Sequence, residues 1–262
     1  MKEPHILYYI NKCKDCGRCV ESCPVNAISR TEAGYLSGDA CIACGKCEKV
    51  CLTNARKLVG TAYSSDELLE LILKDKIYYM TSDGGVTLSG GEVFYQADFA
   101  AQLLEKCQKE DVNTAIETTF FTSKHSIDRV LPYVNQIMCD VKSMDSVKHK
   151  VQTGVDNKII LDNIRYVSGK YRDIPITVRI PYIPGFNDSQ KDMIDIFEFV
   201  KEIRTADRIE ILPYHRLGSS KYEAMGVPYK LGGVLPVPKE RLTEYVEIGE
   251  KLGLKVYIDA SQ

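Results

Sequence analysis

The sequence predicts an α/β protein in which a parallel sheet follows a small cysteine-rich module. From about Ser64 onward, apolar strand-like segments alternate with segments of helical periodicity, the pattern of βα units. Eight of the ten cysteines lie between Cys13 and Cys51, in two copies of one spacing. We therefore expect the module to cover residues 4–60 and the sheet domain to cover 61–262.

The composition is that of an ordinary globular protein. The 262 residues are 44% hydrophobic and 27% charged, with a net charge of −2, so neither nucleic acid nor a membrane surface is an expected partner. No apolar run approaches the ~20 residues of a membrane span, and the N-terminus has no signal-peptide pattern. We expect a cytoplasmic protein. Thiols stay reduced there, so dense cysteine indicates metal binding or catalysis.

The two cysteine copies each read C-x2-C-x2-C-x3-C and lie 28 residues apart. This spacing is typical of paired [4Fe–4S] clusters, in which three cysteines of one copy share a cluster with the fourth cysteine of the other. A pair of zinc sites is disfavoured, because zinc ligands usually form separated pairs. The crossed pattern predicts Cys13, Cys16, Cys19 and Cys51 for cluster I, and Cys41, Cys44, Cys47 and Cys23 for cluster II.

The remaining cysteines, Cys107 and Cys139, lie in a helical and a strand pattern and are expected to be buried thiols. Apolar periodicity predicts the elements of the sheet domain. Ser64 with Glu67 forms a capping-box pattern at the start of the first helix. The other expected helices cover 99–107, 127–134, 157–167, 193–203 and 240–252. The expected strands cover 84–89, 114–118, 137–141, 176–180, 208–212 and 255–258.

Polar side chains stand toward the carboxyl ends of these strands. They are Glu92, Glu117, Asp140, Arg179 and His215. Each one alone would be an ordinary polar residue at a strand end. Five at the same end of successive parallel strands favour a functional edge, because active sites of parallel barrels lie there.

These motifs resemble a known family. Ser89-Gly90-Gly91-Glu92 resembles the Gly-Gly-Glu motif of radical S-adenosylmethionine (SAM) enzymes. Asp140-Val141-Lys142 resembles the Asp-x-Lys motif of glycyl-radical-enzyme activating enzymes, the relatives of pyruvate formate-lyase activating enzyme. The segments around Glu117, Arg179 and His215 follow in the family's order across essentially the whole chain. The resemblance implies a partial (β/α) barrel of radical SAM type with a two-cluster ferredoxin-like insert.

The resemblance also implies roles for individual residues. SAM would be bound by Gly90, Gly91, Glu92, Lys142, Arg179 and His215. Gly90 and Gly91 lack side chains and so allow close approach of the backbone, and Glu92 would anchor their loop. A candidate cation site, for a monovalent or divalent ion, would comprise Glu117, Thr118, Met138 and Asp140; oxygen ligands suit hard cations.

The family's catalytic motif, C-x3-C-x2-C, is missing from these 262 residues. The pairs Cys19–Cys23 and Cys47–Cys51 have the first gap, but Asn26 and Asn54 stand where the third cysteine would be. We therefore expect a barrel without its first strand and catalytic loop, and no catalytic cysteines. Only Ile6–Ile10 could be a strand ahead of the cysteines. A third [4Fe–4S] cluster would require an upstream segment.

The leading hypothesis is an oxidoreductase that uses SAM and one electron to generate a glycyl radical on a partner enzyme in an anaerobic host. The two clusters would relay electrons from a flavodoxin or ferredoxin-type donor, and the chain as written would be inactive for lack of the catalytic cluster. The alternative is a two-cluster electron-transfer or docking protein on a catalytically dead barrel. A radical enzyme of another branch is disfavoured by the Asp140-Val141-Lys142 motif. No residue identifies the particular glycyl radical enzyme.

Overall fold

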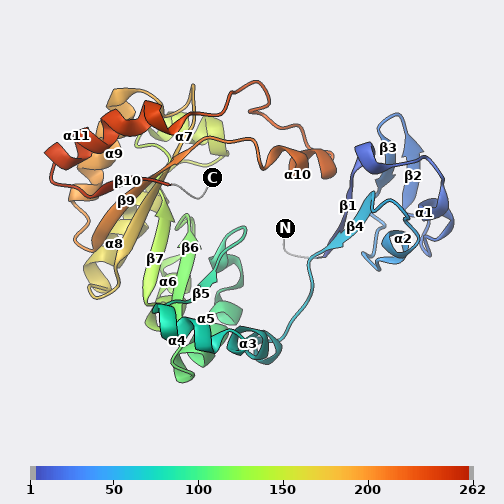
Figure 1. Cartoon of the computed structure of the whole chain (residues 1–262), viewed down its shortest axis with the longest axis horizontal. Coiled ribbons are helices and arrows are strands. Elements are labelled where there is room, and N and C mark those ends of the chain that lie inside the picture. Colours follow the sequence, from blue (N-terminus) through green and yellow to red (C-terminus); the bar gives the residue numbers. More distant parts are fainter. Residues whose placement is uncertain (1–3, 260–262) are drawn as a thin grey trace. The chain divides into compact units, whose positions relative to one another are not determined.

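The computed structural model describes residues 4–259 and divides the chain into two compact units (Figure 1). The cysteine unit comprises the residues up to Ala62 together with Arg216–Val234. The sheet unit comprises Tyr63–His215 and the residues from Leu235 onward. Within the described residues, no helix is both long and apolar enough to cross a membrane.

The cysteine unit is built from short elements. β1 (His5–Tyr8) pairs antiparallel with β4 (Arg56–Val59), and β2 (Ile28–Thr31) pairs antiparallel with β3 (Gly34–Ser37). The expected strand near Ile6–Ile10 is therefore β1, and it belongs to this unit. The unit's helical elements are the 3-10 turn η1 (Ile10–Lys12), α1 (Arg18–Glu21), α2 (Lys46–Lys49) and α10 (Ser219–Ala224).

The sequence repeat is also a repeat of backbone conformation. Gly17 and Gly45 precede α1 and α2 with φ of 72° and 71°, left-handed values that glycine adopts at no steric cost. The equivalent pairs Asp15 with Ala43, and Asn26 with Asn54, have positive φ as well. An alanine such as Ala43 is strained in the left-handed region of φ. The surrounding loop therefore imposes this conformation in both copies, whatever residue type occupies the position.

The sheet unit contains a parallel sheet in the order β10-β9-β8-β7-β6-β5. Its strands are β5 (Gly85–Leu88), β6 (Asn113–Thr118), β7 (Gln136–Asp140), β8 (Ile176–Tyr182), β9 (Ala206–Pro213) and β10 (Val256–Ile258). Its helices are α3 (Ser65–Leu73), α4 (Lys76–Ser82), α5 (Ala97–Lys109), α6 (Lys124–Val130), α7 (Ser146–Thr153), α8 (Lys158–Lys170), α9 (Gln190–Lys201) and α11 (Thr243–Lys251). Short 3-10 turns are η2 (Val93–Gln96), η3 (Leu131–Tyr133) and η4 (Lys239–Leu242).

The predicted α/β class and parallel sheet are confirmed, and each expected strand has its counterpart. The capping box at Ser64 and Glu67 is present in both directions. The helix expected over 127–134 is wrong in its last turn: α6 ends at Val130, and a 3-10 turn with Pro132 follows. Proline lacks the N–H that an α-helix would need there. Helices α4 and α7 were not expected, because their apolar residues follow no clear helical stripe.

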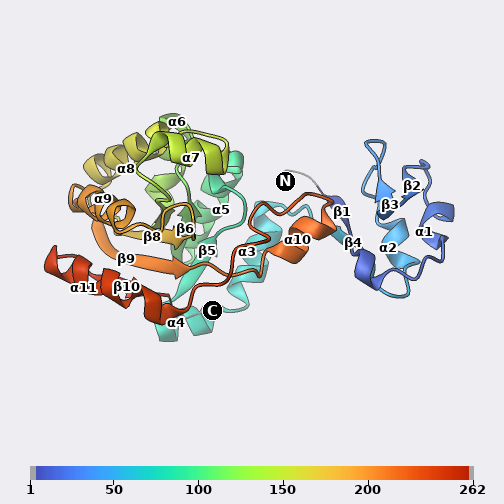
Figure 2. The same ribbon diagram turned by 90° about the horizontal axis from the view of Figure 1, so that it is seen from above.

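Alternation along the strands gives the sheet two different faces. Ile116, Ile137 and Ile209 are at most 1% exposed and alternate with half-buried residues on the opposite face. Figure 2 shows helices α5, α6, α8 and α9 on one side of the sheet. Parallel register then aligns Asp140 with Arg179, and Arg179 with Glu210, across adjacent strands of the half-buried face. The fold thus collects charged side chains into one row.

Candidate functional sites

A cavity of 180 Å³ lies within the cysteine unit. Its lining includes Cys13, Cys16 and Cys19 from the first copy and Cys51 from the second. Among the cysteines of the described residues, these four are the ones that line it, and they are the set expected for cluster I. A cavity lined by four thiols, beside the apolar residues Tyr8 and Val50, fits an iron–sulfur cluster. The ten cysteines are all free thiols.

The fourth cysteine of each copy is held in the same way. The N–H of Ala27 donates to Sγ of Cys23, and the N–H of Ala55 donates to Sγ of Cys51, both over 3.2 Å. Backbone donors around Cys23 hold the pKa of that thiol below its ordinary value. Hydrogen bonds to the charged form favour the thiolate, which is the form that binds iron.

Three of the four cysteines expected for cluster II lie on the second copy, and the fourth, Cys23, lies on the first. Cys41 is half-buried, Cys44 is exposed and Cys47 is buried in the core of the unit. Cys23 packs against the same core. Burial raises the pKa of Cys47, although the charge of Arg56 opposes that rise.

At the edge of the sheet, the loop after β5 is attached to β6 by Glu92. The Glu92 carboxylate accepts hydrogen bonds from Thr118 Oγ1 at 2.7 Å, from the Thr119 N–H at 2.9 Å and from Thr119 Oγ1 at 2.6 Å. Gly90 has a φ of 121°, which glycine alone adopts readily, and a Cβ at Gly90 or Gly91 would meet no other atom within 4 Å. The glycines therefore present open backbone above the sheet, and Glu92 fixes their position.

Arg179 lies between two carboxylates on the half-buried face. Its Nη1 donates to Glu117 at 2.6 Å and its Nε donates to Glu210 at 3.1 Å. Ser89 also donates a short hydrogen bond to Glu117. Burial alone would raise the pKa of Glu117, but the bonds from Ser89 and Arg179 outweigh burial and lower it. These hydrogen bonds thus favour the ionised form of Glu117.

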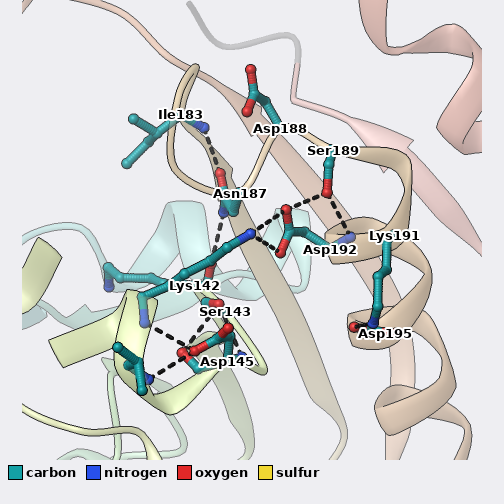
Figure 3. Close-up of polar contacts among 12 residues, drawn as sticks. Lys142, Ser143, Asp145, Ile183, Asn187, Asp188, Ser189, Lys191, Asp192 and Asp195 are labelled. Atoms are coloured by element: carbon teal, nitrogen blue, oxygen red, sulfur yellow. Dashed lines mark hydrogen bonds and ion pairs between the residues drawn. The ribbon is translucent and has the colours of Figure 1, made fainter. Parts of the chain in front are cut away.

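Lys142 and Asp140 form a second ion pair at the end of β7, with 2.6 Å between Nζ and Oδ2. Buried Asn187 connects the loops after β7 and β8. Its side-chain amide donates to the carbonyls of Lys142 and Pro181, each over 2.8 Å, and accepts from the N–H of Ile183 (Figure 3). The Lys142 backbone is thereby tied to the turn that follows Arg179 on its strand.

The residues expected for the cation site lie on adjacent strands but have protein partners in this structure. Glu117 pairs with Arg179, Asp140 pairs with Lys142, and Thr118 donates to Glu92. Met138 is aligned with Glu117 in the β6–β7 register. His215 is half-buried and lies two residues beyond β9.

Four contributors to this edge were missed in the sequence: Ser89, Thr119, Asn187 and Glu210. Glu210 could have been found, because it occupies the polar position of an alternating Ile-Glu-Ile strand. Asn187 lies in a loop with no periodic signal. By contrast, Cys107 and Cys139 are fully buried, as expected. Burial raises the pKa of both thiols.

Two family models match overlapping parts of the chain. Residues 12–55 match the 4Fe-4S dicluster domain, and residues 42–200 match the radical SAM superfamily. The fold and site therefore define a radical SAM protein that carries iron–sulfur clusters, with SAM and such clusters as its cofactors.

Curated relatives define the branch. The (2S)-3-sulfopropanediol sulfolyase activating enzyme of Bilophila wadsworthia is 40% identical over 238 residues, which are 89% of this chain and 78% of that relative. The choline trimethylamine-lyase activating enzyme of Oleidesulfovibrio alaskensis is 38% identical over 240 residues, covering 89% and 77%. A solved domain of pyruvate-formate lyase-activating enzyme from Bacteroides vulgatus matches with a TM-score of 0.56 and 30% identity, over 68% of this chain and 99% of that one. The chain belongs to the family of glycyl-radical-enzyme activating enzymes.

Proposed function

We propose that the edge formed by the Glu92 loop, Arg179 and Lys142 binds SAM for the one-electron generation of a glycyl radical on a partner enzyme, a reaction that also needs a catalytic cluster on a C-x3-C-x2-C motif. The observation that carries this proposal is the row of paired charges beside open glycine backbone, in a chain 40% identical to an activating enzyme. The partner is a glycyl radical enzyme.

Each residue of this edge has a physical role in the proposal. Gly90 and Gly91 offer backbone groups to the methionyl ammonium. Lys142 and Arg179 supply positive charge for the methionyl carboxylate and the ribose, and His215 contacts the nucleoside. Such charges are strongest where they are partly withdrawn from water, and the Arg179 side chain is only 24% exposed. Lys142 and Arg179 are already paired with Asp140 and Glu117. To bind the SAM carboxylate as well, each basic side chain would have to contact that carboxylate and its present partner at the same time.

The cation site is proposed on Glu117, Thr118, Met138 and Asp140. A cation there would take over the carboxylates that Arg179 and Lys142 now hold, which would leave those basic groups available to SAM. Oxygen ligands suit a hard monovalent or divalent ion.

For the cysteine unit, we propose two [4Fe–4S] clusters with the crossed ligand sets given above and a domain boundary near residue 60. The clusters supply one-electron transfer when bound. The cavity lined by Cys13, Cys16, Cys19 and Cys51 supports the first set. Exposed Lys14 and Arg18 line the same cavity, which favours an acidic flavodoxin or ferredoxin-type donor. We also propose a cytoplasmic location, which the dense cysteines of the repeat favour because thiols stay reduced there.

A third cluster does not fit the residues described. Outside the repeat the chain offers Cys107 and Cys139, both fully buried in the sheet unit. After loading with iron and sulfide and reduction, this 262-residue chain should therefore form no 5′-deoxyadenosine from SAM. A chain extended by a C-x3-C-x2-C segment should form it. Product from the 262-residue chain, measured by chromatography, would contradict these assignments.

The second function, electron transfer or docking on a barrel without catalysis, is favoured by the same absence of a three-cysteine site. The iron content of the chain distinguishes SAM-dependent radical formation from this second function. About eight irons per chain correspond to the two clusters of the cysteine unit, whereas about twelve require a third cluster. Radical formation on the partner, detected by electron paramagnetic resonance (EPR), would exclude the docking function.

A further inference from the structure

Arg56 is a charged side chain in the interior of the cysteine unit. It lies at the start of β4, opposite Tyr8 of β1, and is 1% exposed. Its guanidinium carbon lies 5.5 Å from the centre of the Tyr8 ring. A charge in such a position is costly unless an opposite charge compensates it.

The contacts of Arg56 within the described part of the chain include no carboxylate. Nη1 donates to Ser37 Oγ at 2.8 Å, and Nη2 donates to the Tyr35 carbonyl at 2.5 Å. Nε is buried and has no hydrogen-bond partner there. A further contact is with a sulfur: Nη1 lies 4.0 Å from Sγ of Cys47. The guanidinium therefore has neutral partners, one unused donor and its charge uncompensated.

The same side chain reaches both cysteine sets. Arg56 lines the cavity that contains Cys13, Cys16, Cys19 and Cys51, and it contacts Cys47 of the other set. Arg56 is thus positioned to act on thiolates of either set.

We propose that Arg56 is a positioning residue for electron transfer: its buried charge stabilises the reduced form of both clusters and raises their reduction potentials. This inference rests on the proposed two-cluster function of the cysteine unit. Each cluster gains one electron from the external donor without a proton, so the negative charge of the thiolate-bound cluster increases by one unit. A fixed positive charge and N–H donors beside the sulfurs favour that state, because net charge and hydrogen bonding set cluster potentials.

The test is an EPR-monitored redox titration of the reconstituted full chain. Arg56→Gln keeps a hydrogen-bonding side chain and removes the charge, and we expect the reduction equilibrium constant to fall at least tenfold for one or both clusters, which is ~59 mV for a one-electron couple. Arg56→Lys keeps the charge and should shift the constant less than Arg56→Gln. Lys57→Gln removes an exposed charge at the next position and should change it less than threefold.

The outcomes separate this inference from the function on which it rests. Equal potentials in Arg56→Gln and Lys57→Gln would overturn the role of Arg56. If Arg56→Gln fails to retain clusters, Arg56→Lys decides: two clusters near the wild-type potentials support the role of the charge, and any other result for Arg56→Lys assigns Arg56 a structural role only. A wild-type chain with far fewer than about eight irons would instead contradict the two-cluster function.

Discussion

The cysteine unit and the sheet unit bring their functional residues together in different ways. In the cysteine unit, the expected ligands come from two short segments with the same backbone, and the core is a small cluster of Tyr8, Ile28, Tyr35, Cys47 and Ala55. In the sheet unit, the site residues come from separate strands over an extensive apolar interior. Ile164 and Phe197 from its helices, for example, are 0% exposed.

The two sites therefore depend on different stabilising interactions. One of the five core residues of the cysteine unit is itself an expected cluster ligand, and four further cysteines pack against that core. Small units bury a smaller fraction of their surface than large ones, and a bound metal can supply part of their folding free energy. The sheet unit has its own core, so its site depends on side-chain pairing across the strands instead.

The largest expected effect is that of removing the iron–sulfur clusters, because only the cysteine unit should depend on them for its folding. Anaerobic chelation of iron should remove hydrogen-exchange protection from β1–β4, because the apo cysteine unit retains too small a core to stay folded. Protection of β6–β8 should remain. Mass spectrometry of peptides after exchange measures both in one sample. The comparison is wrong if β1–β4 keep their protection without iron.

Cysteine variants provide the matched control. Cys19→Ala should lower iron content and loosen the cysteine unit. Cys107→Ala, outside the repeat and 0% exposed, should keep the iron and cost the sheet unit only about 1 kcal/mol for the small cavity. Equal iron loss in both variants would contradict the ligand assignment.

A smaller effect tests the charge row of the sheet unit. Arg179→Gln leaves Glu117 and Glu210 without their shared cation, and we expect a loss of about 2 kcal/mol in the free energy of unfolding, less than for a fully buried pair. Urea unfolding of the sheet unit measures it, and equilibrium dialysis should show weaker SAM binding in the same variant.

Two controls accompany Arg179→Gln. Arg179→Lys retains the charge but cannot donate to both carboxylates at once, so its loss should be smaller. Arg165→Gln removes a pairing with Glu202 in which both side chains are about half exposed, and it should cost less than about 1 kcal/mol. A loss for Arg179→Gln no greater than for Arg165→Gln would show that the row does not stabilise the fold.

The two units also differ in how far the sequence predicts them. Crossed ligation is a prediction from the repeat alone, because all the residues concerned lie within local segments of fixed spacing. Glu92, Glu117 and Arg179 could be placed at the same edge, since parallel strands align their carboxyl ends. The hydrogen-bond partners of these residues could not be predicted from the sequence. The contact of Arg179 with Glu210, for example, depends on the β8–β9 register, which shifts at an irregularity near Ile176. Arg56 carries no motif, and its burial follows only from how β4 packs.

The smallest expected effect concerns Asp128, a surface carboxylate that joins α6 to α8 within the sheet unit. It accepts hydrogen bonds from the Tyr166 hydroxyl at 2.7 Å, from the Tyr171 hydroxyl at 2.8 Å and from Lys170 at 2.8 Å. The hydrogen bond from Lys170 and those from the tyrosines lower the pKa of Asp128 from 3.8 to about 2. The carboxylate therefore stabilises the folded state fully above about pH 4, and this contribution is lost as the pH falls toward 2.

Asp128→Asn should cost about 1 kcal/mol at pH 7, a figure reduced for solvent screening because 38% of the side chain is exposed. The difference from wild type should shrink as the pH falls from 4 toward 2, since Asp128 of the unfolded chain binds a proton near pH 4 whereas the folded carboxylate does so only near pH 2. Urea unfolding of the sheet unit at pH 7 and pH 3 measures it. Asp98→Asn, whose carboxylate is 84% exposed beside Arg129, should change stability at neither pH. A difference for Asp128→Asn that stays constant with pH would mean that packing of the two tyrosines, rather than the ionised carboxylate, holds these helices together.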